Sequence, residues 1–270
     1  MSRPRRSPVQ KYYDRVADRY DHSYDDSYWR WHDSLTWDYI KPYLPSDQSV
    51  PVLDLGCGTG KWGSKLIKSG FNVTFVDISA RMLDQARAKI AEKGGESKAN
   101  YLKADLGDLS ELPDGAFGLA VAMGDPIGCT ESPIGAMKEI RRVLTVGGVL
   151  TATVDNQLAA IDFYLETAVP GELEEFLKTG KTHWLTKAKD EQFPIFTFTA
   201  DRLCKLATRA GFEVVDLIGK TVLPMRHHRE LLSDSRQRLR WTRIEQSLCR
   251  KPDAISRASH LHITCRAVAQ

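Results

Sequence analysis

The chain has 270 residues, of which 42% are hydrophobic and 27% charged, and its formal net charge at pH 7 is +3. This composition is typical of a folded globular protein with a sizeable core, and the near-neutral charge gives no reason to expect a nucleic acid or a membrane surface as partner. The five scattered cysteines include no C-x-x-C pair, so we expect a reducing, cytoplasmic environment and neither disulfides nor a bound metal.

Strand and helix patterns alternate from residue 50 onward. Seven short runs rich in apolar and β-branched residues are predicted strands: residues 50–55, 71–78, 99–106, 117–123, 149–154, 212–219 and 261–268. Helical composition is found at residues 60–69, 80–93, 131–144, 200–210 and 230–249, and Ser79 is a predicted N-cap. Strands that alternate with helices indicate a doubly wound α/β fold with a mostly parallel sheet, in which ligands bind beyond the carboxyl ends of the strands.

The first predicted strand runs into a glycine-rich turn within the stretch VLDLGCGTGKWG, residues 52–63. Glycines at three alternate positions of this turn let the backbone adopt positive φ and approach a ligand closely, and the helix that follows presents unpaired N–H groups. Residues 58–63 also fit G-x-G-x-x-G, the pattern of dinucleotide sites, which alone is weak evidence. The turn therefore predicts a nucleoside ligand without identifying it.

Three aspartates near the predicted strand ends narrow the choice of nucleoside. Asp77 ends the second strand, where a carboxylate can accept from both ribose hydroxyls, as it does in NAD sites. Asp54 would sit poorly beside a pyrophosphate but suits a ligand with an ammonium group, and Asp105 can accept from an adenine amine. A nicotinamide-dependent oxidoreductase remains an alternative, although no tyrosine is followed by lysine four positions later, the pair that a short-chain reductase needs.

Four motifs together resemble those of the class I S-adenosylmethionine-dependent methyltransferases: VLDLGCGTG (52–60), VDIS (76–79), KADL (103–106) and IRRVLTVGGVL (140–150). The resemblance implies S-adenosylmethionine as cofactor and a Rossmann-like, seven-stranded, mostly parallel sheet whose antiparallel last strand is inserted as an edge partner. It also implies a single domain with a partly helical cap. This domain would consist of the cap at 1–49, a cofactor-binding core at 50–155, substrate-side insertions at 156–199 and 220–258, and final sheet elements at 200–219 and 259–270.

The same resemblance assigns cofactor contacts residue by residue. Asp77 would hold the ribose, while Asp105 and the Leu106 backbone would bind the adenine. A Y-Y-D-x-x-A-x-x-Y-D pattern at 12–21 would cover the cofactor. The full set of expected contacts is Tyr12, Tyr20, Asp54, Gly56, Cys57, Gly58, Asp77, Ile78, Asp105, Leu106 and Met123.

Methyl transfer needs a positioned acceptor and, for a hydroxyl or an ammonium group, a group that takes its proton. The candidates are His183 in a polar loop, Asp125 after the fourth strand and His227 after VLPM. DNA adenine methyltransferases carry Asn-Pro-Pro-Tyr where this chain has Gly-Asp-Pro-Ile at 124–127, which speaks against a nucleic-acid substrate. The sequence thus predicts methyl transfer to an oxygen or nitrogen of a small molecule, with a non-catalytic cofactor-binding protein as a further alternative. It leaves open whether the chain is a monomer or a homodimer.

Overall fold

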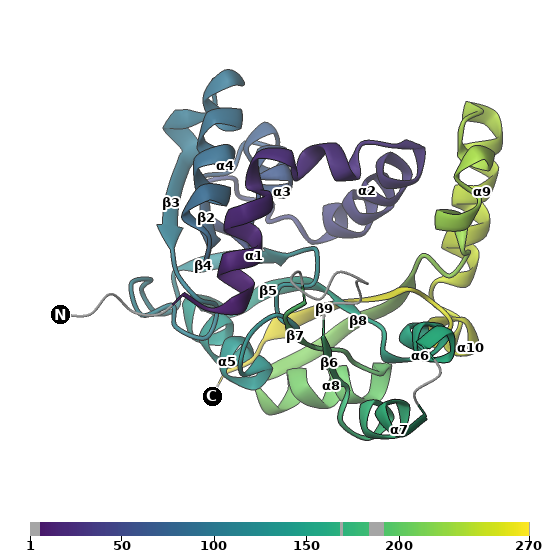
Figure 1. Ribbon diagram of the computed structural model, residues 1–270. Coiled ribbons are helices and arrows are strands. Elements are labelled where there is room, and N and C mark those ends of the chain that lie inside the picture. The colour runs from purple at the N-terminus through teal and green to yellow at the C-terminus, as the bar shows by residue number, and fades with distance from the viewer. Residues whose placement is uncertain (1–5, 168–169, 184–191, 270) are drawn as a thin grey trace.

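The structure, a computed structural model, describes residues 6–167, 170–183 and 192–269. Its centre is a seven-stranded sheet in the order β3-β2-β1-β4-β5-β9-β8 (Figure 1). The strands are β1 (Val52–Leu55), β2 (Val73–Asp77), β3 (Ala99–Lys103), β4 (Phe117–Ala122), β5 (Leu144–Asp155), β8 (Phe212–Lys220) and β9 (His260–Ala267). Only β9 runs antiparallel, and it lies between β5 and β8, which leaves β8 at the edge. The predicted α/β fold with an antiparallel last strand is confirmed.

Helices of the described ranges surround this sheet, and none is long and apolar enough to cross a membrane. They are α1 (Pro8–Val16), α2 (Ser27–Ile40), α3 (Lys61–Lys68), α4 (Ala80–Glu92), α5 (Pro133–Val143), α6 (Ile161–Thr167), α7 (Pro170–Thr179), α8 (Ala200–Arg209), α9 (Ser235–Leu248) and α10 (Pro252–Ile255). Short 3₁₀ turns lie at 17–19, 21–24, 41–43, 96–98, 157–160, 225–227 and 229–232. Ser79 caps α4 as predicted, because its Oγ accepts from the Met82 N–H at 3.2 Å.

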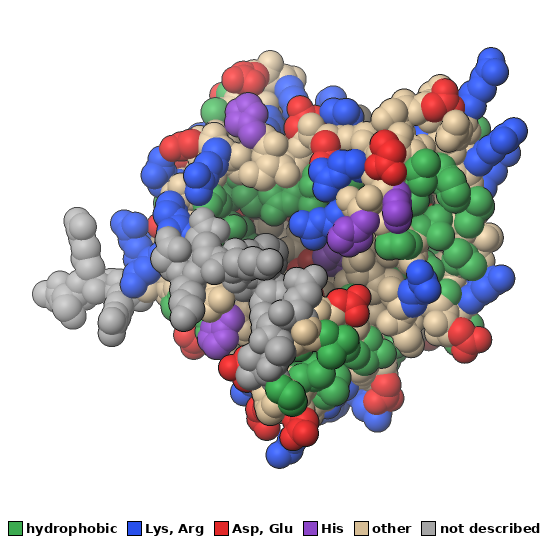
Figure 2. All heavy atoms as spheres, turned by 45° about the vertical axis from the view of Figure 1, so that its right-hand side comes forward, with side chains coloured by type: hydrophobic (Ala, Val, Ile, Leu, Met, Phe, Trp, Pro, Cys, Tyr) green, Lys and Arg blue, Asp and Glu red, His purple; other side chains and the backbone are tan. Residues whose placement is uncertain are grey.

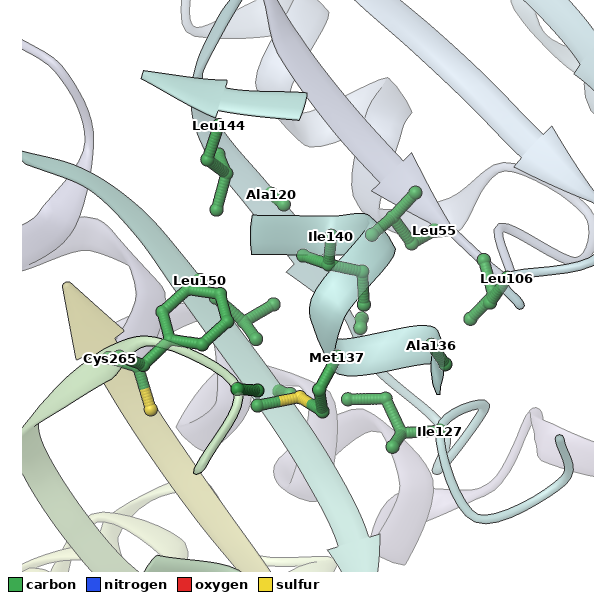
Figure 3. Close-up of a cluster of buried hydrophobic side chains, with 14 of the residues drawn as sticks. Leu55, Leu106, Ala120, Ile127, Ala136, Met137, Ile140, Leu144, Leu150 and Cys265 are labelled. Carbon is green, nitrogen blue, oxygen red and sulfur yellow. The ribbon is translucent and has the colours of Figure 1, made fainter. Parts of the chain in front are cut away.

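The sheet is buried on both faces because successive side chains of a strand point to opposite sides. Val52 of β1 packs in a cluster with residues of α3 and α4, whereas the next residue, Leu53, packs with residues of α5 and α8. Figure 3 shows part of the cluster that contains Leu53, in which Met137 and Ile140 of α5 lie against the sheet near Leu150. This burial on both faces explains why the strands read as nearly continuous apolar runs.

The N-terminal helices are attached to the carboxyl edge of the sheet at two places. Asp14 of α1 accepts from the Ser79 Oγ at 2.6 Å, which ties α1 to the turn between β2 and α4. Helix α2 buries Tyr28 and Trp31 in a cluster that includes Ile218 of β8. The cap therefore spans the sheet from β2 to β8, above the strand ends where a ligand is expected.

Other elements differ from the sequence-based expectations. A second, two-stranded sheet of β6 (Lys181–His183) and β7 (Pro194–Phe196) was not predicted, because three-residue strands are too short to show an alternating pattern. Strand β5 begins before the expected residue 149, at Leu144, with a shift of register against β4. The expected helix at 230–249 begins only at Ser235.

Gly63 lies in the first turn of α3, where this helix crosses β2. A Cβ built on Gly63 would lie 2.1 Å from Phe75 Cε1 and 2.9 Å from Asp54 Oδ2. Phe75 is fully buried and stacks on Tyr101 with ring centroids 5.1 Å apart, so its ring has no space to move aside. Close packing of helix on strand therefore explains the last glycine of the G-x-G-x-x-G pattern.

We expect Gly63→Ala to lower the free energy of unfolding by about 1–3 kcal/mol, because the clash outweighs the gain in helix propensity. Gly171→Ala is the matched control, since Gly171 lies in α7 and nothing is within 4 Å of its Cβ position. This control should be neutral or slightly stabilising. Urea denaturation measures both, and equal stability of the two variants would contradict the packing argument.

Candidate functional site

Two adjoining cavities lie at the carboxyl edge of the sheet. The smaller, of about 80 Å³, lies over the glycine turn, and the larger, of about 800 Å³, lies over the ends of β4, β5, β8 and β9. Tyr13, Tyr20 and Gly124 line both cavities, so the two spaces meet at these residues. The cavities begin between β1 and β4, where the strand order reverses, which is where a doubly wound sheet binds ligands.

The glycine turn forms one wall of the smaller cavity. Gly56 and Gly58 have φ of 61° and 53°, in the left-handed region, and a Cβ on Gly56 would lie 2.4 Å from Pro126 Cβ. Asp77 holds the turn: its Oδ2 accepts from the Gly58 N–H and its Oδ1 from the Ser79 N–H, each at 2.8 Å. Burial raises the pKa of Asp77 to about 6, against the opposing effect of these hydrogen bonds.

Most of the expected cofactor contacts line this smaller cavity: Tyr20, Gly56, Gly58, Asp77, Ile78, Asp105, Leu106 and Met123. Tyr20 comes from the cap, and the others lie at the carboxyl ends of four neighbouring strands, β1 to β4. Asp105 is oriented by the Gly107 N–H, which donates to its Oδ1 at 2.7 Å. The sequence analysis missed the other lining residues, which are Val9, Tyr13, Ala104, Gly124, Pro126, Cys129 and Thr130.

Tyr13 rather than Tyr12 reaches the cavity from α1. Val9 and Tyr13 are four positions apart and share the helix face that lines the smaller cavity. The ring of Tyr12 points elsewhere and packs against Tyr13 and Phe193, each with a centroid distance of 5.2 Å. The motif located the covering helix, and the helical period decides which tyrosine faces inward.

Asp54 and Cys57 lie beneath the turn and do not line either cavity in the described part of the chain. Asp54 Oδ2 accepts from the Gly63 N–H at 2.7 Å, so the carboxyl satisfies a donor at the start of α3. Burial raises the pKa of Asp54 to about 8, and its Oδ1 has no hydrogen-bond partner among the described residues. Cys57 is 5% exposed and packs in the core cluster of α3 and α4. Both residues were expected to contact the cofactor. In the structure they support the turn from below and do not reach the cavity.

A row of ionisable side chains crosses the floor of the larger cavity. The sheet register pairs Asp155 of β5 with His260 of β9, and His260 with Lys220 of β8. Residues directly opposite on neighbouring strands point to the same face, so these three side chains stand side by side. Asp125, which follows β4, extends the row: its Oδ2 lies 3.0 Å from His260 Nδ1, and Asp155 Oδ1 lies 3.7 Å from the same nitrogen.

Burial and proximity set the charges of this row. Burial raises the pKa of Asp155, and the Asp125 carboxylate adds to the shift. Burial acts in the same direction on Asp125, but its neighbour His260 outweighs it and holds the pKa of Asp125 below its usual range. Lys220 is only 2% exposed, and burial lowers the pKa of its ammonium group to about 8. Opposite charges therefore face one another at a depth where water screens them little.

The predicted proton acceptors differ in their positions. Asp125 lies on the floor of the larger cavity, and His227 is exposed at its rim. His183 ends β6 with an exposed side chain and does not line either cavity within the described ranges. The sequence analysis missed His260. Its signal was topological, because the first residue of an antiparallel strand lies level with the carboxyl ends of its parallel neighbours.

Asp125, Asp155 and His260 also form a group whose potential ligand atoms lie within 4.8 Å of one another, close enough together to hold a metal ion. The rim of the larger cavity is basic, with Arg226, Arg257 and His227 among its lining residues. Figure 2 shows this face of the molecule, where basic and histidine side chains gather beside a hollow and hydrophobic side chains lie next to them.

The motif-bearing part of the chain matches a family model described as a methyltransferase domain, over residues 52–148. A Bacillus subtilis protein named methyltransferase YqeM is 26% identical over 52% of this chain. A malonyl-[acyl-carrier protein] O-methyltransferase of Pectobacterium atrosepticum is 33% identical over 40% of this chain. The matched segments span 60% and 39% of those two relatives. The ubiquinone biosynthesis O-methyltransferase of Pseudomonas aeruginosa is 26% identical over 68% of this chain and 73% of its own length.

Solved structures share the whole fold at low sequence identity. The CcbJ methyltransferase of Streptomyces caelestis has a TM-score of 0.62 and 19% identity, with 96% of this chain and 98% of that chain covered. An S-adenosylmethionine-dependent methyltransferase of Mesorhizobium loti has a TM-score of 0.60 and 21% identity, with 86% and 97% covered. Residues 52–148 are thus a methyltransferase domain, and the strand order and the four motifs agree with those of the class I S-adenosylmethionine-dependent methyltransferases, whose cofactor is S-adenosylmethionine.

Proposed function

We propose that the protein transfers the methyl group of S-adenosylmethionine to an oxygen or nitrogen of a small molecule held in the larger cavity. The pair of adjoining cavities carries this proposal, because one has the chemistry of a nucleoside site and the other offers ionisable groups beside it. The proposed domain organisation has the same support: the larger cavity is lined by the cap at 1–49 and by both insertions, 156–199 and 220–258.

The residues around the smaller cavity suit the cofactor, and the cavity, of about 80 Å³, would have to widen to admit it. Gly58 has a positive φ, and the Tyr20 ring lies 3.9 Å from its Cβ position, so backbone and ring enclose a narrow slot. In the proposed complex, Asp77 accepts from the ribose hydroxyls, Asp105 accepts from the adenine amine and Ile78 packs on the adenine ring. S-adenosylmethionine, when bound, supplies an electrophilic methyl group with a good leaving group already attached.

The larger cavity suits a small acceptor. Its cap side consists of aromatic side chains, including Tyr24 and Trp29, whose ring centroids are 4.8 Å apart, and its floor is the ionisable row. The cavity is concave, as small-molecule sites are, and it combines this aromatic side with a floor and rim that are mostly polar. The names of the Pectobacterium and Pseudomonas relatives contain the term O-methyltransferase, which supports oxygen as one acceptor atom.

Asp77→Ala should raise the dissociation constant of S-adenosylhomocysteine about 10- to 100-fold, because hydrogen bonds to a charged group contribute about 1.5–3 kcal/mol. In the wild-type protein, affinity should also fall as the pH drops through about 6, since Asp77 then takes up a proton and becomes a weaker acceptor. Asp77→Asn should remove this pH dependence. Isothermal titration calorimetry measures each value.

The control for these titrations is Asp84→Asn, an exposed position on α4 outside both cavities, which should bind like the wild-type protein. Thermal melts of every variant separate a loss of affinity from a loss of folding. Binding of NADH in place of S-adenosylhomocysteine would contradict the proposal and favour an oxidoreductase.

With S-adenosylmethionine and a panel of phenol, catechol, tyramine and histamine, the protein should release S-adenosylhomocysteine together with a methylated product, detected by mass spectrometry. Trp29→Ala should raise the KM of an acceptor about 2- to 10-fold, since an aromatic contact contributes about 0.5–1.5 kcal/mol. Trp37→Ala, on the same helix but outside the cavities, is its control. Methylation of unfractionated tRNA with no transfer to the panel would overturn the small-molecule proposal.

A further inference from the structure

The strand register places His260 between three other ionisable groups. It is paired with Asp155 on one side and Lys220 on the other, and Asp125 approaches from the end of β4. The Nδ1 atom of His260 is buried, whereas a fifth of its side chain is exposed and lines the larger cavity. Because Nδ1 faces the carboxylate, the opposite edge of the ring, which carries Nε2, is the one available to a molecule in the cavity.

The backbone holds Asp125 in place for this contact. Its φ is 66°, a left-handed conformation that is unusual for a residue other than glycine. The Thr153 Oγ1 accepts from the Gly124 and Asp125 N–H groups, at 3.0 and 3.3 Å, and fixes the loop to β5. An uncommon backbone conformation that is held by a neighbouring strand, with its carboxylate 3.0 Å from a histidine nitrogen, is typical of a functional site.

The neighbouring charges determine the protonation of His260. Burial alone would lower its pKa, but Asp125 and Asp155 outweigh burial and the repulsion of Lys220, so the net shift is upward. His32 of α2 faces His260 with ring centroids 6.0 Å apart and adds no charge, because burial lowers its pKa to about 3. His260 is therefore a stronger base than a free imidazole, and it acts as a base at a pH above its raised pKa.

We infer that His260, oriented by Asp125, takes the proton from the methyl acceptor. The acceptor group must therefore carry such a proton, as a neutral hydroxyl or an ammonium group does. This inference rests on the proposed function. For a hydroxyl, the proton would pass to Nε2 while the oxygen bonds to the methyl carbon and the carbon–sulfur bond breaks, with its electron pair left on sulfur. An ammonium group would first lose its proton to Nε2, which frees the nitrogen lone pair for the same displacement. Asp125 stabilises the imidazolium that forms. Carboxylate and phosphate acceptors need no such base.

The same groups are the candidate cation ligands, so the two assignments exclude each other. A His260–Asp125 pair agrees better with the arrangement, because His260 Nδ1 lies 3.0 Å from Asp125 Oδ2 and the buried Lys220 ammonium already places a positive charge beside the two carboxylates. An added divalent ion would have to overcome that charge.

Reaction with diethyl pyrocarbonate tests the base in the free protein, without cofactor or acceptor. Peptide mapping should show His260 modified, with a rate that rises through a midpoint above that of a free histidine. Asp125→Asn should lower this midpoint by about 1–3 pH units, and asparagine tolerates the left-handed backbone. His262, which is 2% exposed and outside the cavity lining, should stay unmodified.

Catalysis is tested with the hydroxyl acceptors of the panel. His260→Gln should lower kcat about 10²- to 10⁴-fold, with the affinity for S-adenosylhomocysteine within about twofold of the wild-type value. His228→Gln is the matched control, since this exposed histidine lies 3.8 Å from the Glu230 carboxylate outside the cavities. Retained binding shows that the cofactor site survives, so failure of the His260–Asp125 pair is distinct from failure of the proposed function.

Three results would overturn the inference. One is an unmodified His260, or a modification midpoint that Asp125→Asn leaves unchanged. Another is transfer to a hydroxyl acceptor that His260→Gln does not slow. The third is loss of activity in EDTA with recovery on addition of Mg²⁺ or Mn²⁺, which would assign Asp125, Asp155 and His260 to a metal ion instead.

Discussion

The antiparallel pairing of β9 between β5 and β8 decides which side chains meet at the open edge of the sheet. In a purely parallel sheet, only carboxyl-terminal residues of strands reach that edge. The reversed strand contributes its first residue, His260, at the level where β5 and β8 end with Asp155 and Lys220. Lys220 is buried and the other two side chains are partly buried on the same face, so a shift of register by one residue would turn the whole row to the opposite face. The chemistry of the larger cavity therefore depends on hydrogen bonds of the backbone.

The glycine turn depends on a different constraint, which is the supply of acceptors for buried backbone donors. Asp77 accepts from the N–H groups of Gly58 and Ser79, and Asp54 accepts from that of Gly63. These carboxyls hold the backbone of the turn in the absence of a nucleoside, so the turn itself is ordered before one binds. The two acids next to the turn thus have distinct positions: Asp77 faces both the turn and the cavity, while Asp54 supports the helix from below.

The sequence was informative where a local pattern repeats. Runs of apolar and β-branched residues located the seven strands of the main sheet, and the motifs after β1, β2 and β3 pointed to residues that line one cavity, including Asp77 and Asp105. It was less informative where position depends on tertiary contacts. The helical period places Tyr12 and Tyr13 on different faces of α1, but only the docking of the helix shows which face meets the cavity. The exposed position of His183 likewise depends on a small sheet without a sequence pattern. The position of His260 in the cavity could be recognised only from the register of β9.

The left-handed backbone of Asp125 also limits how this site can vary among descendants of the same chain. A position with φ near 66° admits glycine, asparagine and aspartate at little energetic penalty and rejects β-branched residues. Aspartate there gives the neighbouring histidine a counter-ion, asparagine gives it a neutral hydrogen-bond partner, and glycine leaves it free. A single substitution in this loop can therefore change the basicity of the histidine while the backbone around it keeps its conformation.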